Sequence, residues 1–247
     1  GAVLAKAEES VSFDGYRTPI LTTVLKAAQA FLAAQSVPAE SLVGIGVSAT
    51  GQIDSRKGIV AGTCGSLPNY IGAPIKAELE KTFGLPVTVA NDANCMTLGE
   101  VWVGGAQGYT DVIGVTLGTG FGACFIVDGC YATYGPGVPI GGELWDYPFR
   151  GRIAEDFVST RWFEEKFRQI TGVAITGVKP MIDYYHADKY TAEVRAIFDE
   201  FARTFAEIML PFVQRFGADT LVVGGGMVRA EEFFFPQLRA AFEHKGV

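Results

Sequence analysis

The sequence predicts an α/β protein, because short apolar strands alternate with helices along its 247 residues. Residues 115–127 hold two apolar, β-branched runs around a turn with three glycines, which is typical of a hairpin. Residues 87–89 predict a strand that ends in the polar corner 91–94. Residues 220–223 predict a buried strand that runs into three glycines. Hydrophobic residues make up 49% of the chain, which is enough for a substantial core without disulfides.

The predicted elements follow one another without a low-complexity linker. In the first part of the chain we expect a helix over 19–35 capped by Thr18, strands over 43–47 and 58–61 joined by a turn at 49–54, a helix over 74–83 ended by Gly84, a strand over 87–89 and a helix over 93–103. In the second part we expect a strand meander over 111–132 with turns at 118–122 and 128–129, helices over 153–167 and 191–216, a strand over 220–223 and a helix after Pro236. The two glycine-turn meanders suggest duplicated lobes, but their similarity is too weak to establish a repeat.

Charge and hydropathy exclude two classes of partner. The formal net charge is −7 and no basic stripe is present, which argues against nucleic-acid binding by general electrostatics. The longest apolar runs are far shorter than the ~20 residues that span a bilayer, and no signal peptide opens the chain. We therefore expect a cytoplasmic protein with no nucleic-acid and no membrane partner.

The cysteines show no spacing typical of a metal site. They form no CxxC pair and stand among apolar residues or glycines, which favours small core residues in a reducing cytoplasm. Because the chain has two histidines besides, a Cys/His zinc site is not expected. These residues are Cys64, Cys95, Cys124 and Cys130, with His186 and His244.

The glycine turn at 118–122 is the first candidate for chemistry. Gly118, Gly120 and Gly122 allow a sharp bend and a close approach of the backbone to a ligand. The freed amides, with Thr119 beside them, can point at phosphate oxygens. The turn is no Walker loop, because GxxxxGK[ST] is absent, and its GxGxG spacing before a strand is no Rossmann fingerprint. Taken alone, it is better explained as an ordinary tight hairpin.

The corner at 91–94 is the second candidate. Asp92 would lie at the carboxyl end of a strand, just before a helix, where ligands of α/β folds gather. A carboxylate there could accept the proton of a substrate hydroxyl during phosphoryl transfer. The structural alternative is that Asp92 or Asn91 caps the following helix. The corner alone favours the cap.

Three further segments place small or polar residues where a ligand could bind. The glycines at 224–226 could admit a purine or ribose against the backbone, or could form a tight strand-to-helix turn. Glu143 and Asp146, on a glycine-rich loop, and Glu155, at an early helix turn, could accept hydrogen bonds from sugar hydroxyls, or could be solvated surface acids. Asn69 could be a turn residue or another hydroxyl ligand.

Taken together, the order and spacing of these motifs resemble the ROK family of sugar kinases and sugar-responsive repressors, within the actin-like hexokinase ATPase superfamily. The resemblance runs from Gly44 to about Gly226. Its most specific part is FGLPVTVANDAN over 83–94 with LGE over 98–100, which is similar to the family's FGLPVxVxNDAN…LGE segment. The other matches are GIGV over 44–47 with GQID over 51–54, LPN over 67–69, TLGTGFG over 116–122 and DTLVVGGG over 219–226.

The resemblance implies a two-lobed actin-like ATPase (ribonuclease H-like) fold, with an incomplete smaller N-terminal lobe over 1–105 and a larger C-terminal lobe over 106–247. The family's first strands, with their DxGGT phosphate turn, and its last C-terminal elements are not found, since residues 1–5 look like the second or third strand of the fold. The lobes would close over ATP and Mg²⁺ on one side and a hexose on the other, and exclude water. The family also suggests a homodimer.

The resemblance implies a role for each matched residue. Asp92 would be the general base that takes the proton of the sugar's primary hydroxyl as the γ-phosphoryl group departs. Sugar hydroxyls would be held by Asn69, Asn91, Asp92, Glu143 and Glu155. The nucleotide would be held by Gly118, Thr119 and Gly120 at its phosphates and by Gly224 and Gly225 at its adenosine. Asp146 stands where many members carry a zinc-binding histidine that touches a hydroxyl, so it is a further sugar candidate and no protein metal ligand is expected.

Two functions from different classes follow. The first is an ATP-dependent hexose kinase that makes a sugar 6-phosphate from glucose or a derivative. The alternative is a non-catalytic sugar-sensing regulator of the ROK repressor type. Retention of Asp92 and of both nucleotide-side glycine turns favours the kinase, whereas the missing DxGGT turn keeps the regulator, and a purely structural role, open. The sequence does not distinguish between hexoses.

Overall fold

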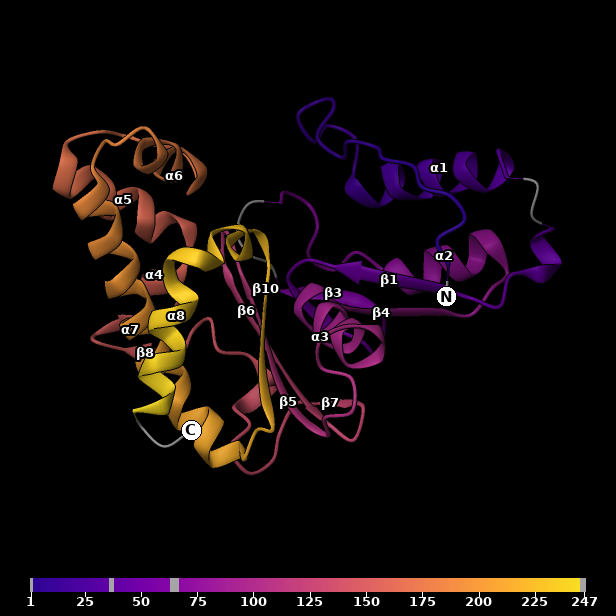
Figure 1. Ribbon diagram of the computed structural model, residues 1–247. Helices are drawn as coiled ribbons and strands as arrows, with labels where there is room; N and C mark the ends of the chain where they lie inside the picture. Colours follow the sequence, from indigo (N-terminus) through magenta and orange to yellow (C-terminus); the bar gives the residue numbers. More distant parts are fainter. Residues whose placement is uncertain (1, 36–37, 63–66, 245–247) are drawn as a thin grey trace. The chain divides into compact units, whose positions relative to one another are not determined.

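The computed structural model describes residues 2–35, 38–62 and 67–244, and the chain divides into two compact units, 1–92 (unit 1) and 93–247 (unit 2) (Figure 1). The elements of unit 1 are α1 (Ile20–Ala33), η1 (Ala39–Ser41), β1 (Ile45–Ala49), β2 (Gln52–Asp54), β3 (Ile59–Gly62), α2 (Ile75–Phe83) and β4 (Val87–Asn91). After α3 (Asp92–Val103), unit 2 contains β5 (Asp111–Leu117), β6 (Phe121–Val127), β7 (Cys130–Ala132), η2 (Ile140–Gly142), β8 (Pro148–Phe149), β9 (Arg152–Ile153), α4 (Glu155–Val158), α5 (Thr160–Thr171), α6 (Lys179–His186), α7 (Thr191–Phe216), β10 (Thr220–Gly224), η3 (Gly226–Ala230) and α8 (Glu231–Glu243).

Unit 1 is built on two small sheets. β1 pairs with β4 in parallel, from Ile45 opposite Val87 to Ala49 opposite Asn91. β2 and β3 form an antiparallel pair with a register shift between Gln52 and Ile53. The apolar side chains of these strands pack with α1 and α2 around the buried residues Ile20, Ala49, Val60, Tyr70, Ile75, Leu79, Val87 and Val89.

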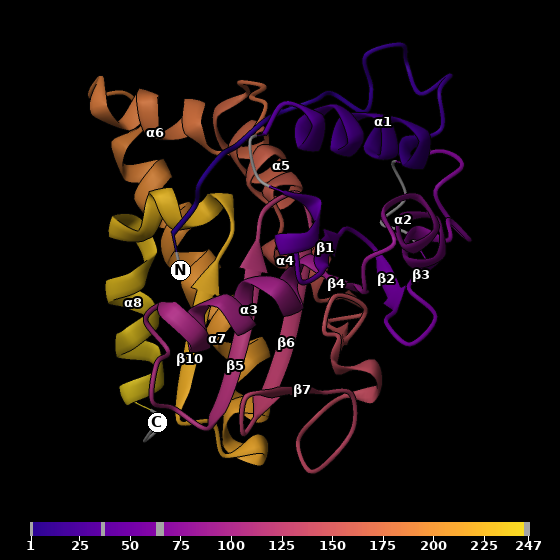
Figure 2. The same ribbon diagram turned by 90° about the vertical axis from the view of Figure 1, so that its right-hand side faces the viewer.

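Unit 2 is built on one four-stranded sheet in the order β10-β5-β6-β7. β10 lies parallel to β5, and β5, β6 and β7 form an antiparallel meander. Alternate side chains of β5 face opposite sides of the sheet. Ile113, Val115 and Leu117 join the core with α7 and α8, whereas Val112 packs on the other side with residues of α3. Figure 2 shows α3 and α7 on opposite faces of this sheet.

Glycines allow α3 to lie directly on the sheet. A Cβ added to Gly114 on β5 would overlap the side chain of Thr97, and one added to Gly224 on β10 would stand 2.9 Å from the sulfur of Met96. Real Cβ atoms need more room than this, so these strands carry glycine where the helix crosses them. The close packing fixes α3 on the sheet of unit 2.

The other face of the sheet is covered by aromatic side chains. Phe163, Phe198, Phe201 and Phe234 are fully buried and come from α5, α7 and α8. Their rings meet edge-on or tilted, with centroids 4.9 Å apart for Phe163 and Phe201 and 5.2 Å apart for Phe201 and Phe234. Such pairs stabilise a core beyond the burial of their area. This core forms the larger hydrophobic cluster of the described structure.

Most of the predicted elements are confirmed. The α/β class holds, and the long helix is α7 with the predicted bounds 191–216. Gly84 ends α2 with φ 66°, the left-handed conformation that glycine adopts without strain. The meander over 111–132 has its turns where they were predicted. β1 begins and ends two residues later than predicted, and α6 was not predicted.

Three predicted elements are wrong in detail. The helix over 153–167 is interrupted, because Ser159 is extended (φ −93°, ψ 164°) between α4 and α5. α8 begins before Pro236 instead of after it, so the proline lies inside the helix, where it has no N–H to donate to the carbonyl of Glu232. The described part of residues 1–5 forms no strand.

The predicted cap of the first helix is also wrong. Pro19 occupies the N-cap position of α1, and the hydroxyl of Thr18 donates to Asp14 Oδ2 at 2.7 Å instead of accepting a hydrogen bond from the helix. The Thr18 amide donates to the same oxygen at 2.9 Å. Asp14 therefore fixes the entry to α1.

The cysteines are only partly core residues. Cys124 is buried, and desolvation raises the pKa of its thiol to about 12. Cys95 is half-buried, whereas Cys130 is exposed, so the core assignment is wrong for Cys130 because β7 is the short outer strand of the sheet. Cys64 lies outside the described residues. Within the described ranges, no helix is both long and apolar enough to cross a membrane.

Candidate active site

The glycine turn of unit 2 joins β5 to β6 and closes with one hydrogen bond of its own. The Gly118 amide donates to the Gly120 carbonyl at 3.1 Å, and Thr119 at the tip is exposed. Within the described residues, no hydrogen bond engages the amides of Thr119 and Gly120. Two neighbouring amides and an exposed hydroxyl form an arrangement that can donate to an anion.

Close neighbours explain the glycines of this turn. A Cβ added to Gly120 would stand 2.8 Å from Glu155 Oε2. One added to Gly122 would overlap the Thr116 hydroxyl and stand 2.9 Å from the Cβ of Ala93. Packing therefore favours glycine at Gly122, whereas at Gly120 the neighbour is the flexible end of the Glu155 side chain.

The second glycine element meets the first. Gly224 at the end of β10 lies opposite Thr116 of β5. Gly225 has φ +90°, and a Cβ there would overlap the backbone of Leu117, the last residue before the turn. Both predicted nucleotide elements thus lie side by side in unit 2, with Gly225 and Gly226 exposed.

The start of β10 is tied to β5 by a carboxylate. Asp219 Oδ2 accepts from the Asp111 amide at 3.0 Å and from the amide and hydroxyl of Thr110 at 3.2 and 3.0 Å. The Asp111 backbone bond, followed by those from Thr110, lowers the pKa of Asp219 below its ordinary value of 3.8. This connection sets the register in which the two glycine elements meet.

In the acidic loop of unit 2, hydrogen bonds connect two predicted sugar ligands, Glu143 and Glu155, through Trp145. Glu143 is half-buried, and its Oε2 accepts from Trp145 Nε1 at 2.8 Å. The Trp145 carbonyl accepts from the Glu155 amide at 3.0 Å, which joins this loop to the start of α4. Asp146 is exposed, which is compatible both with a sugar ligand and with a solvated surface acid.

Glu155 also reaches the glycine turn. Its Oε2 accepts from the Phe121 amide at 3.1 Å, and its Oε1 accepts from Arg161 Nη2 at 2.7 Å. Each carboxylate oxygen can accept two hydrogen bonds, so further donors could still bind here. The structure therefore brings Glu155 together with Gly120 and Phe121 of the turn, which the sequence had not predicted.

The remaining predicted residues belong to unit 1. Asn91 ends β4 and is half-buried; its Nδ2 donates to the Gly51 carbonyl at 2.9 Å, in the turn after β1. Asp92 follows it as the first residue of α3 and is exposed. Asn69 is exposed in a turn with φ +55°, a conformation that asparagine tolerates. The predicted site residues are thus divided between unit 1 (Asn69, Asn91 and Asp92) and unit 2.

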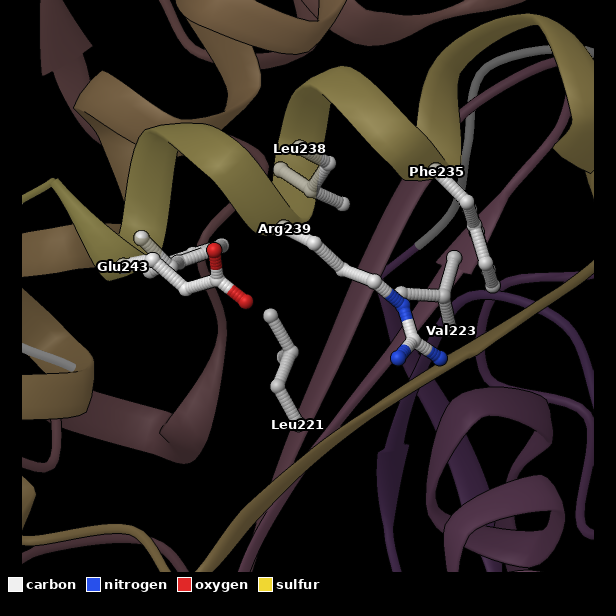
Figure 3. Close-up of a pocket in the computed structure, with 7 residues that line it drawn as sticks. Leu221, Val223, Phe235, Leu238, Arg239 and Glu243 are labelled. Carbon is white, nitrogen blue, oxygen red and sulfur yellow. The ribbon is translucent and has the colours of Figure 1, made fainter.

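Two further features bear on ligand binding, the grouping of possible metal ligands and a groove in unit 2. Across residues 2–35, 38–62 and 67–244, no group of three or more His, Cys, Asp or Glu could hold a metal ion. A groove of about 330 Å³ lies between β10 and α8 (Figure 3). Its lining is Leu221, Val223, Phe235, Leu238, Arg239, Phe242 and Glu243, and includes no predicted site residue.

Sequence reasoning missed the two residues that follow Ser159. Thr160 donates a hydrogen bond to Gly118 of the glycine turn. Arg161 donates to Glu155, which in turn accepts from Phe121 at the end of the turn. Their only signal in the sequence is the pair Ser159-Thr160, which could begin a helix. The sequence pattern predicted one continuous helix over 153–167, which placed this pair in its interior.

A family comparison assigns the chain as a whole. The model of the ROK family matches residues 3–143, which is more than half of the chain. An uncharacterized protein of Clostridium perfringens is 30% identical over 197 residues, covering 78% of this chain and 65% of that protein. A glucokinase of Thermotoga maritima is 27% identical over 217 residues, covering 79% of this chain and 67% of that enzyme. The chain thus spans about two thirds of the length of these relatives.

A solved structure gives the same fold. The ROK family glucokinase from Streptomyces griseus, in complex with glucose and AMPPNP, has a TM-score of 0.69 to this chain. The match covers 90% of this chain and 77% of that one, at 23% identity. At this identity the likeness shows the fold alone, which is the predicted actin-like ATPase fold.

Proposed function

The chain belongs to the ROK family, and on this premise we propose that the protein is an ATP-dependent sugar kinase. It would transfer the γ-phosphoryl group of ATP to the primary, 6-hydroxyl group of a hexose such as glucose or a derivative. The glucokinase among its relatives supports the sugar-kinase class. Because the chain spans about two thirds of those relatives, the activity is proposed for the whole protein.

The observation that carries the proposal is the meeting of the two glycine elements in unit 2. The amides of Thr119 and Gly120, unengaged within the described residues, would donate to phosphate oxygens. Gly224, half-buried, and Gly225, exposed and held against Leu117, would face the adenosine. A protein that only senses a sugar has less need of this pair.

Asp92 is the proposed general base. It is exposed at the junction of β4 and α3, where a substrate hydroxyl can reach it. Its carboxylate would orient the hydroxyl and take its proton as the new O–P bond forms. Such a base contributes typically a hundredfold to ten-thousandfold in rate.

The sugar ring would be held by the polar residues of both units. In unit 1 these are Asn69 and Asn91, and in unit 2 they are Glu143, Asp146 and Glu155. Two of them are already oriented, because Trp145 Nε1 holds Glu143 and Arg161 holds Glu155. Oriented acceptors select among hydroxyl positions, since a misplaced hydroxyl leaves a polar group unpaired.

Mg²⁺ would accompany ATP and neutralise charge on its phosphates. The lobes proposed at 1–105 and 106–247 would close around the substrates in the cytoplasm, in a homodimer. Closure would remove the water that otherwise competes as acceptor.

The test is coupled ADP release by the full-length protein with ATP, Mg²⁺ and a panel of hexoses. The panel is glucose, a β-glucoside, N-acetylglucosamine, N-acetylmannosamine and fructose. Turnover that depends on one preferred sugar would support the kinase and identify its substrate. Sugar binding by calorimetry without any ADP release would contradict the kinase and favour the regulator.

A further inference from the structure

A short segment of unit 2 crosses beside the glycine turn and holds its first carbonyl. The amide and the hydroxyl of Thr160 both donate to the Gly118 carbonyl, each at 2.7 Å. The two donors saturate both lone pairs of that oxygen. The position of the turn is thereby tied to the first residue of α5.

The same segment holds the other end of the turn through Glu155. The carboxylate accepts from the Phe121 amide, and Arg161 binds its second oxygen. The Phe121 ring is itself buried and meets Phe205 of α7 edge-on, with centroids 6.2 Å apart. The turn is thus fixed at both ends, while the amides between them are left for a ligand.

The interruption at Ser159 makes this arrangement possible. In a continuous helix the Thr160 amide would donate its hydrogen bond to the carbonyl of Asp156, four residues earlier. Because Ser159 is extended, α5 starts afresh at Thr160, and the first amides of a helix need partners outside it. The Gly118 carbonyl is such a partner.

We propose that Thr160 and Arg161 are positioning residues for nucleotide binding, which hold the glycine turn 118–122 in the shape that its amides need. Thr160 acts on Gly118 directly, and Arg161 acts through the carboxylate of Glu155. The inference rests on the proposed function, since it assigns the ATP phosphates to this turn. It predicts that a change at Thr160 weakens ATP binding more than hexose binding, whereas a change at Arg161 weakens both, because Glu155 is also a proposed sugar ligand.

The size of each effect follows from exposure. Thr160 is half-buried, and the loss of its hydroxyl bond should change the exchange rate of the turn amides and the KM for ATP roughly threefold to tenfold. The Arg161 side chain is 67% exposed and that of Glu155 20%, so this ion pair is screened by water. The loss of this ion pair should change the same exchange rate and the KM for ATP roughly twofold to threefold.

The experiment compares two variants with two matched controls in the full-length protein. Thr160→Val removes the hydroxyl at constant shape; its control is Ser159→Ala, since the buried Ser159 hydroxyl has no hydrogen-bond partner within the described residues. Arg161→Gln removes the charge; its control is Arg152→Gln, whose partner Asp156 lies on the same segment away from the turn. Arg161→Lys tests rescue by charge.

Hydrogen–deuterium exchange of the ligand-free protein is the first readout. We expect the hydrogen-bonded amides of Gly118 and Phe121 to exchange faster by the factors above in Thr160→Val and Arg161→Gln. Both controls should exchange at the parental rate, and Arg161→Lys should come close to it. Parental exchange in the two folded variants would overturn the inference. If Thr160→Val does not fold, Thr160→Ser, which keeps the hydroxyl, and Arg161→Gln decide the question.

The KM values for ATP and for the hexose are the second readout. In Thr160→Val we expect the KM for ATP to rise roughly threefold to tenfold and the KM for the hexose to change less than about twofold. Arg161→Gln should raise the KM for ATP roughly twofold to threefold and should also raise the KM for the hexose, because Arg161 orients the proposed sugar ligand Glu155. Faster exchange with unchanged ATP affinity would overturn the positioning role. Absence of any ATP turnover by the parent would instead count against the proposed function, and the exchange data would still decide whether residues 160 and 161 hold the turn.

Discussion

The two units repeat one order of elements around a glycine turn. In unit 1, β1 is followed by a turn, β2, β3 and a helix, and then by β4 parallel to β1. In unit 2, β5 is followed by a turn, β6, β7 and helices, and then by β10 parallel to β5. The order of elements is thus similar, but β1–β4 and β2–β3 form separate sheets in unit 1, whereas β10, β5, β6 and β7 form one sheet in unit 2, so the duplication stays a prediction.

The two turns are held by different means. In unit 1 the Gly51 carbonyl accepts a hydrogen bond from Asn91, which ends the neighbouring strand β4. In unit 2 the Gly118 carbonyl accepts from Thr160, which belongs to a helix outside the sheet. β1 alternates between half-buried and exposed residues, whereas β5 is almost entirely buried.

The difference separates two kinds of site. In unit 1 the residue that holds the turn is itself a proposed sugar ligand, so any change there should affect both the turn and the sugar. In unit 2 Thr160 is distinct both from the amides proposed to bind phosphate and from the proposed sugar ligands, so at Thr160 holding and binding can be changed separately, whereas Glu155 has both roles. Four predictions test this comparison, from the largest expected effect to the smallest.

Asp92→Asn should have the largest effect. If the corner of unit 1 carries the chemistry, this variant should lose about a hundredfold to ten-thousandfold in kcat, because a proton acceptor is lost at constant size. Hexose affinity measured by calorimetry should stay near the parental value. Asp128→Asn, at the exposed β6–β7 turn, is the control. Turnover close to parental in Asp92→Asn would show that the base lies elsewhere.

Gly225→Ala should destabilise unit 2 by about 2–4 kcal/mol, from a positive φ and overlap with the Leu117 backbone. Gly226→Ala is its control, because a Cβ there meets nothing within 4 Å. Urea unfolding followed by tryptophan fluorescence measures the effect, since the three tryptophans, Trp102, Trp145 and Trp162, all lie in unit 2. Equal stability of the two variants would contradict the contact between the two glycine elements.

Asn91→Ala tests the double role of the holding residue in unit 1. The variant leaves the Gly51 carbonyl without this donor, so unit 1 should lose about 1 kcal/mol. Faster hydrogen exchange over 45–49 and a higher KM for the hexose should appear together, with the KM for ATP unchanged. Gln35→Ala removes a similar amide-to-carbonyl bond at the end of α1 and should leave the hexose KM at its parental value. A change in the ATP KM alone would erase the distinction between the units.

The sequence predicted what local patterns determine. The glycine-punctuated meander, the helix at 191–216 and the end of α2 at Gly84 all follow from periodicity and turn chemistry. The contacts of the candidate site did not follow, because they join distant residues. Glu155 reaches Phe121 across 34 positions, and Thr160 reaches Gly118 across 42. The extended Ser159 that enables them interrupts a pattern that is otherwise helical, so tertiary hydrogen bonding overrode local propensity.

The smallest effect is expected on acid stability, through two carboxylates, Asp54 in unit 1 and Asp219 in unit 2, that each accept two backbone amides. Hydrogen bonds, chiefly from the Lys57 amide to Asp54 and from the Asp111 amide to Asp219, lower the pKa of both carboxyls below 3.8. A lowered folded-state pKa means that this stability is present above about pH 3.8 and is lost as the pH falls through the folded-state values.

Asp54 holds a local turn, whereas Asp219 joins β10 to β5 across 108 residues. Asp219→Asn should therefore reduce the acid sensitivity of unit 2 more than Asp54→Asn reduces that of unit 1. The measurement is urea unfolding between pH 3 and 6, followed by tryptophan fluorescence for unit 2 and by hydrogen exchange over 52–62 for unit 1. An unchanged pH dependence in Asp219→Asn would mean that the register of the two glycine elements does not depend on this carboxylate.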